Sequence, residues 1–153
     1  MAVHEAGHAV IGLVQGLAIL EVQIGGLAPN GIGLMVGGTT FDAPVGDVRV
    51  LMREQPEQMG VALMAGAAAE LKFYRGSISQ SYDEDLKILR RGMGWLEGLN
   101  DVQQAAVTGY LEAAIDAVAD HRQAIQRTAE ALIAGRRLSG LEVSAILESA
   151  PPE

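Results

Sequence analysis

The amino-acid sequence predicts a mainly α-helical fold of the α+β kind, a compact helical domain with a small β-hairpin after its first helix. Long segments repeat apolar residues every three or four positions, which is the spacing of one helix face. Residues 19–40 are instead rich in β-prone residues and glycine. A length of 153 residues without an internal repeat or a low-complexity linker fits one domain over residues 1–153.

The first helix is predicted over residues 3–17, where apolar side chains follow helical spacing. Glycines in this segment weaken a helix but allow close packing against another element. Residues 19–24 and 32–40 then form two β-prone runs, separated by glycines and by Pro29-Asn30. These runs predict a β-hairpin with a loose, glycine-rich turn.

Residues 47–55 are predicted as a short helix, and Pro56 suits the first turn of the next one. Residues 57–74 predict a strong helix, because Met59 and Leu63 begin an apolar stripe that continues through Ala67 and Leu71. Ser81-x-x-Glu84 has the form of a capping box, which predicts a helix from residue 82 or 83 towards residue 96.

Asn100 can cap a long alanine-rich helix over residues 101–134, with a possible break near Asp120. Gly135 is the predicted end of this helical region, since glycine tolerates the left-handed conformation found at many helix ends. Ser139-x-x-Glu142 is a second capping box and predicts a last short helix to about residue 148.

Composition excludes several classes of protein. Lys and Arg number 11 against 19 Asp and Glu, a net charge of −8, which argues against a protein that binds nucleic-acid phosphates. The longest apolar stretch, residues 9–22, is too short and too polar for a membrane-spanning helix. The absence of cysteine suits the reducing cytoplasm, which is the predicted location, and leaves only imidazoles and carboxylates as metal ligands.

Residues 4–8 read His-Glu-Ala-Gly-His, an H-E-x-x-H motif on the predicted first helix. Positions i and i+4 share a helix face, so the imidazoles of His4 and His8 can bind one cation. Glu5 lies near the same site, where it can accept a proton from a water molecule that the metal activates. The motif therefore predicts a zinc site with Glu5 as catalytic base. The competing interpretation is two histidines that only pack on an ordinary helix.

A catalytic zinc ion takes three protein ligands, and the motif supplies two. No third histidine follows at the usual spacing, and His121 is expected on the exposed face of a helix, far along the chain. A carboxylate is therefore the expected third ligand. The residues alone leave four candidates open: Asp83, Glu84, Asp85 and Glu70.

With these motifs in view, the chain resembles the zinc peptidase domain of the FtsH-type ATP-dependent metalloproteases. That family opens with a helix bearing the same H-E-A-G-H element, followed by a short β element and a helix with a Gly-Gly-x-x-Ala-Glu-like signature, similar to residues 65–70 here. A later helix carries an Asp ligand in its first turn, and Asp85 matches it. The final region of the chain resembles the paired C-terminal helices of the family, with residues 131–143 matching the turn between them.

The resemblance implies a zinc metalloendopeptidase in which His4, His8 and Asp85 hold Zn²⁺. Glu70 is a candidate to accept the other N–H of a ligand imidazole, or else it is an ordinary salt-bridge residue of its helix. A peptide substrate could pair as an added strand along the hairpin edge around Gly33 and Leu34.

The expected activity is hydrolysis of peptide bonds in unfolded or flexible polypeptides. The family's ATPase module is missing, because the chain has no phosphate-binding loop with its lysine. A separate ATPase or unfoldase is therefore an expected partner, and the family's rings imply a homo-oligomer. The alternative is a non-catalytic peptidase-like module for binding or assembly that uses the fold as a scaffold.

Overall fold

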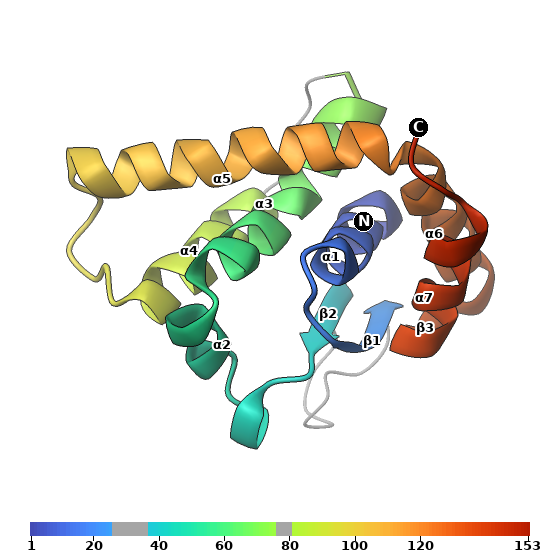
Figure 1. Cartoon of the computed structure of the whole chain (residues 1–153), viewed down its shortest axis with the longest axis horizontal. Helices are drawn as coiled ribbons and strands as arrows, with labels where there is room; N and C mark the ends of the chain where they lie inside the picture. The colour runs from blue at the N-terminus through green and yellow to red at the C-terminus, as the bar shows by residue number, and fades with distance from the viewer. Residues whose placement is uncertain (26–36, 76–80) are drawn as a thin grey trace.

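The computed structural model of the chain describes residues 1–25, 37–75 and 81–153 (Figure 1). Helices dominate, and a small antiparallel sheet accompanies them, which confirms the predicted mainly α-helical fold with a small β element. In chain order the elements are α1 (Ala2–Val14), β1 (Ile19–Ile24), β2 (Gly37–Phe41), the short 3₁₀ helix η1 (Pro44–Gly46), α2 (Val48–Glu54), α3 (Pro56–Phe73), α4 (Ser81–Met93), α5 (Asp101–Asp120), α6 (Arg122–Gly135), β3 (Arg137–Ser139) and α7 (Gly140–Ser149).

Helix α1 forms the centre of the fold, with α3 on one side, α6 and α7 on the other, and the sheet beneath it (Figure 1). Its residues from His4 to Gly12 are all buried, so the motif helix is a core helix rather than a surface one. A close crossing with α3 explains the small residues in both helices. A side chain at Gly7 would place its Cβ 2.6 Å from the carbonyl oxygen of Ala65.

The sheet has the strand order β2-β1-β3, and both neighbours of β1 run antiparallel to it. Val22 lies opposite Thr39 on β2 and opposite Leu138 on β3. Strands β1 and β2 confirm the predicted pair, although residues 26–36, with most of the predicted second strand, lie outside the described residues. Strand β3 was not predicted, because three residues between two helices carry too little periodicity to reveal a strand.

Several helix boundaries differ from the predictions. Helix α1 ends at Val14 rather than residue 17, since Gly16 adopts a left-handed conformation with φ +83° and stops the helix. Helix α4 ends at Met93, before Gly94 with φ +73°, so Trp95 lies beyond the helix and not on it. The helix predicted to run towards residue 96 therefore ends earlier, because Gly94 takes a left-handed conformation.

Two of the three predicted N-terminal caps and the break in the long helix are confirmed. Helix α4 begins at Ser81, so Ser81 is the first residue of the helix rather than the residue before it. Asn100 and Ser139 each form a full capping box, and Pro56 occupies the first turn of α3. The break falls at His121, between α5 and α6, so the prediction of a mid-helix, exposed His121 was wrong: the residue is partly buried at a junction. Arg136, not Gly135, takes the left-handed conformation after α6, with φ +67°.

None of the described helices combines the length and the apolar character needed to cross a membrane.

Candidate metal centre

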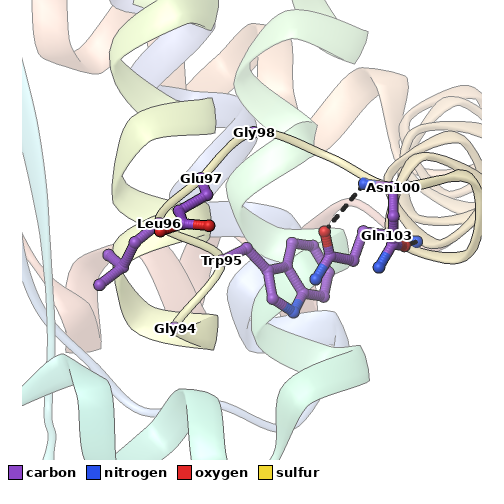
Figure 2. A pocket seen from close by; sticks show the side chains of 7 residues that line it. All are labelled: Gly94, Trp95, Leu96, Glu97, Gly98, Asn100 and Gln103. Carbon is purple, nitrogen blue, oxygen red and sulfur yellow. Dashed lines mark hydrogen bonds between the residues drawn. The ribbon is translucent and has the colours of Figure 1, made fainter.

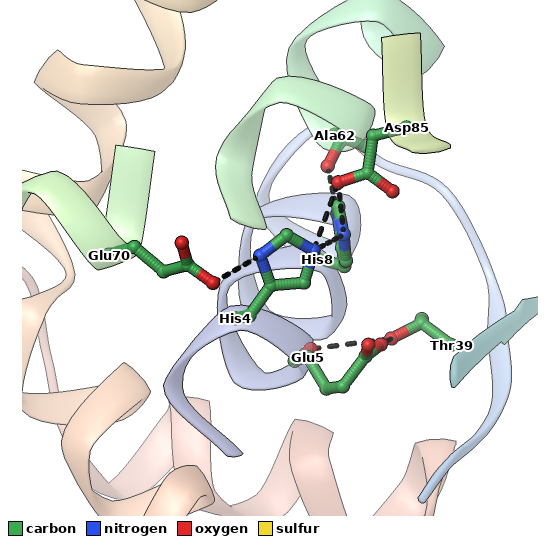
Figure 3. A network of polar contacts seen from close by, with 7 residues as sticks. All are labelled: His4, Glu5, His8, Thr39, Ala62, Glu70 and Asp85. Carbon is green, nitrogen blue, oxygen red and sulfur yellow. Dashed lines mark hydrogen bonds and ion pairs between the residues drawn. The ribbon is translucent and has the colours of Figure 1, made fainter. Parts of the chain in front are cut away.

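His4 and His8 lie one turn apart on α1 and are both buried, with exposed fractions of 1% and 5% (Figure 3). Their rings meet edge to face, with centroids 4.6 Å apart. The two Nε2 atoms are 3.0 Å apart. The i, i+4 spacing thus directs both imidazoles to one point, as the sequence predicts.

Asp85, just beyond the first turn of α4, is the third member of this cluster. Its Oδ2 atom lies 2.9 Å from Nε2 of His4 and 3.2 Å from Nε2 of His8. Of the other candidates on this helix, Asp83 and Glu84 are exposed, and Glu84 pairs with Lys87 at 2.7 Å. The structure therefore brings Asp85 to the histidines and leaves its two acidic neighbours outside the cluster.

Atoms of α3 hold the far side of each imidazole. Nδ1 of His8 donates a hydrogen bond to the carbonyl oxygen of Ala62 at 2.8 Å. Nδ1 of His4 lies 2.9 Å from Oε1 of Glu70, which is a buried ion-pair contact outside hydrogen-bond geometry. Protons on both Nδ1 atoms would leave both Nε2 lone pairs directed at Asp85. Glu70 therefore lies where its carboxylate can orient the ring of His4.

Three electron-rich atoms about 3 Å apart in a buried site require a cation among them. A proton can serve: burial alone lowers the pKa of His8, but the negative charge of Asp85, 3.2 Å away, and that of Glu5 raise it to about 9. Burial raises the pKa of Asp85, and the facing His8 and His4 more than reverse this, so the net pKa is lowered. Asp85 is therefore a carboxylate at neutral pH, and a metal ion must displace the His8 proton.

The cluster fits a small divalent metal ion. In tetrahedral zinc sites with bonds of about 2.0–2.1 Å, ligand atoms are roughly 3.3 Å apart, close to the 2.9, 3.0 and 3.2 Å found here. Oδ2 of Asp85 is buried without a hydrogen bond of good geometry. Gly66 of α3 keeps the space clear, because a Cβ there would lie 2.6 Å from both Nε2 atoms.

Glu5 is 6% exposed and lies near enough to the cluster for its charge to act on His8. Thr39 of β2 donates its hydroxyl to Oε2 of Glu5 at 3.2 Å and to the backbone oxygen of Glu5 at 3.3 Å (Figure 3). Gly37, at the start of the same strand, packs so closely that a Cβ there would lie 2.8 Å from Oε1 of Glu5. Strand β2 thus fixes the carboxylate of Glu5 against α1.

The sequence predictions missed the contacts from Thr39 and Ala62. Thr39 is one of two adjacent threonines in a predicted strand, and only the pairing of β2 beside α1 shows which one reaches Glu5. Ala62 contributes a backbone carbonyl, for which no side-chain pattern exists. The predicted substrate-edge residues Gly33 and Leu34 lie outside the described residues.

No protein-family model matches the chain, and no curated protein is detectably similar to it in sequence.

Proposed function

We propose that this chain is a zinc-dependent metallopeptidase that hydrolyses peptide bonds in unfolded or flexible polypeptides. The observation that supports it most is the buried triangle of His4 Nε2, His8 Nε2 and Asp85 Oδ2, with the Glu5 carboxylate beside it. Two neutral imidazoles and one carboxylate, with a fourth position left for water, are the ligand chemistry of a catalytic zinc site. A purely structural site needs no adjacent base, so a buried Glu5 favours catalysis over a scaffold role.

The residues divide the work of hydrolysis. His4, His8 and Asp85 would hold the metal, and Glu70 and the Ala62 carbonyl would fix the imidazole orientations. Zinc held there would supply acidity to a bound water and polarise a substrate carbonyl. Glu5 would be the base that takes the water proton on its carboxylate and would pass a proton to the leaving amine. Thr39 holds Oε2 of Glu5 and so limits the positions from which this transfer occurs.

The proposed substrate class rests on the burial of Glu5 and Asp85 and on the edge position of strand β2. Glu5 and Asp85 are only 6% and 8% exposed, so a folded protein surface cannot reach them. In the described sheet β2 is an edge strand, and an extended peptide can pair with such an edge through its backbone regardless of sequence. Folded substrates would therefore require a separate unfoldase. A cytoplasmic homo-oligomer is the proposed setting, on resemblance to the FtsH-type family.

Glu5→Gln tests the proposal, because it keeps the shape of the side chain and removes the base. We expect zinc content to stay at the wild-type level, while hydrolysis of a fluorescent casein falls by about 100-fold or more. Glu84→Gln, an exposed change on α4, is the matched control and should retain full activity. Wild-type zinc together with undiminished hydrolysis in Glu5→Gln would reject the peptidase mechanism. Zinc binding with no hydrolysis in the wild type would favour the assembly module.

A further inference from the structure

A second surface feature lies away from the cluster, where the chain turns from α4 to α5. Two hollows of about 460 Å³ and 280 Å³ lie there, and Trp95 and Leu96 line both of them. Figure 2 shows the larger one. Neither hollow includes a member of the proposed metal site. The feature is therefore independent of the proposed peptidase activity.

The smaller hollow is strongly basic. Its lining consists of Lys87, Arg90, Arg91, Trp95 and Leu96, so three of the chain's 11 basic residues meet there with no carboxylate in the lining. Lys87 pairs with Glu84, and Nε of Arg90 donates to the carbonyl of Trp95 at 3.3 Å. Arg91 is exposed and forms no ion pair with any residue that the structure describes. On a chain of net charge −8, such a site attracts anionic groups locally.

The shared wall is apolar and accessible. Leu96 is 74% exposed, and Trp95 is half-buried beside it, so the two form an accessible apolar surface. Aromatic and arginine side chains together are typical of residues that dominate protein–protein binding energy. This wall therefore suits an apolar side chain of a partner.

The larger hollow offers hydrogen-bond donors, and its only charged lining residue is Glu97, an exposed carboxylate. Asn100 and Gln103 line it, and their side-chain oxygens already accept the capping bonds from each other's backbone N–H groups (Figure 2). Both side-chain NH₂ groups remain as donors. Such donors match the carbonyl oxygens of an extended peptide backbone.

We infer that the Trp95–Leu96 surface binds an acidic, leucine-containing segment of a partner protein. Carboxylates of that segment lie over Arg90 and Arg91, an apolar side chain packs on Trp95 and Leu96, and the backbone continues towards Asn100. Charge complementarity selects this occupant and its direction, because carboxylates are attracted to Arg90 and Arg91 at the smaller hollow and repelled by Glu97 at the larger one.

Trp95 is the only tryptophan, so its fluorescence reports directly on this surface. The experiment titrates the full chain with a short, end-capped peptide of alternating glutamate and leucine, with and without zinc. We expect a saturable change in emission that weakens as ionic strength rises. The same peptide with lysine in place of glutamate should give no saturable change.

Arg91→Glu should weaken binding by about tenfold or more, because it sets like charges against each other at the hollow. Arg127→Glu, on exposed α6 across the molecule, makes the same charge change and should bind like the wild type. If both variants weakened peptide binding equally, the effect would come from the overall charge of the chain, and the proposal would be overturned. Equal binding of the lysine peptide, or tighter binding of a single-stranded oligothymidylate, would also overturn it. Loss of zinc or of hydrolysis alone would not affect these readings.

Discussion

Two glycines of helix α3 make room for side chains from neighbouring helices, and the side chains that they admit differ in chemistry. Gly66 faces His4 and His8 of α1, and Gly60 faces the ring of Tyr110 on α5. A Cβ at either position would lie 2.5–2.6 Å from the inserted side chain. The same packing device thus makes a candidate metal centre at one crossing and an ordinary helix contact at the other.

The difference lies in what each crossing encloses. At Gly66 the inserted atoms are Nε2 lone pairs facing a buried carboxylate, and they need a cation. At Gly60 the inserted group is a phenol ring, and burial, followed by the charge of Glu57, raises the pKa of Tyr110 so that it stays neutral. Close packing at a glycine therefore does not by itself indicate a metal site. The chemistry of the side chains packed against the glycine does.

The largest expected difference separates Gly66→Ala from Gly60→Ala. The first forces both imidazoles away from Asp85, so zinc affinity should fall on the order of 100-fold, with hydrolysis lost. The second should lower the free energy of unfolding by about 1–3 kcal/mol through overpacking, and leave zinc affinity unchanged. Zinc titration and chemical denaturation of both variants make the comparison. Equal zinc affinity in the two variants would show that Gly66 has no special role at the metal ligands.

Charge changes along α3 sharpen the same contrast. Glu70→Gln keeps the shape beside Nδ1 of His4 but removes its negative charge, so zinc affinity should fall about 10- to 100-fold. Glu57→Gln makes the same change near Tyr110, at the other crossing, and should leave zinc affinity at the wild-type value. A Glu70→Gln variant that binds zinc as the wild type does would make Glu70 an ordinary helix residue.

The pH dependence should also differ between the two crossings. Protonated His8 competes with the metal below its pKa of about 9, so zinc affinity should rise about tenfold per pH unit towards pH 9. The metal-free protein should show the opposite trend. Because the pKa of His8 is raised on folding from 6.5, its contribution to stability is complete below pH 6.5 and is lost as pH rises to about 9.

Tyr110 contributes no such change in that range, because its raised pKa keeps it neutral. Denaturation of the metal-free chain in steps from pH 6 to pH 9.5 measures the trend, and His8→Gln is the control in which it should vanish. A metal-free wild type whose stability rises over this range would contradict the assigned protonation.

The smallest effect is expected at Thr39. Thr39→Val keeps the side-chain shape and removes the hydroxyl that holds Glu5, so kcat/KM should fall roughly 3- to 10-fold with zinc content unchanged. Thr40→Val, at the exposed neighbouring position of β2, should match the wild type. A loss of zinc in Thr39→Val would show that the contact supports the fold of the cluster rather than the orientation of Glu5.

The sequence predicts the parts of this fold that depend on local signals. The i, i+4 spacing brings His4 and His8 together, and the caps at Asn100 and Ser139 depend on residues three positions apart. Such signals act between residues within about one turn of a helix, so they do not depend on how the helices pack against one another.

Features that depend on contacts between residues far apart in the chain could not be predicted from the sequence. Spacing alone could not separate Asp85 from Asp83, because the choice depends on how α4 turns towards α1 in the folded chain. The same holds for Thr39, and for β3, which exists because β1 offers a free edge. The positive φ of Arg136 arises where α6 must turn at once into that strand, against the ordinary preference for glycine.

The central claim is that His4, His8 and Asp85 hold one metal ion, and zinc content tests it most directly. Elemental analysis of chelated and zinc-reloaded protein should give about one zinc per chain for the wild type and for Asp83→Ala, whose side chain is exposed. Asp85→Ala should retain close to none, because two imidazoles alone bind weakly. Wild-type zinc in Asp85→Ala, with the fold intact by circular dichroism, would contradict the account.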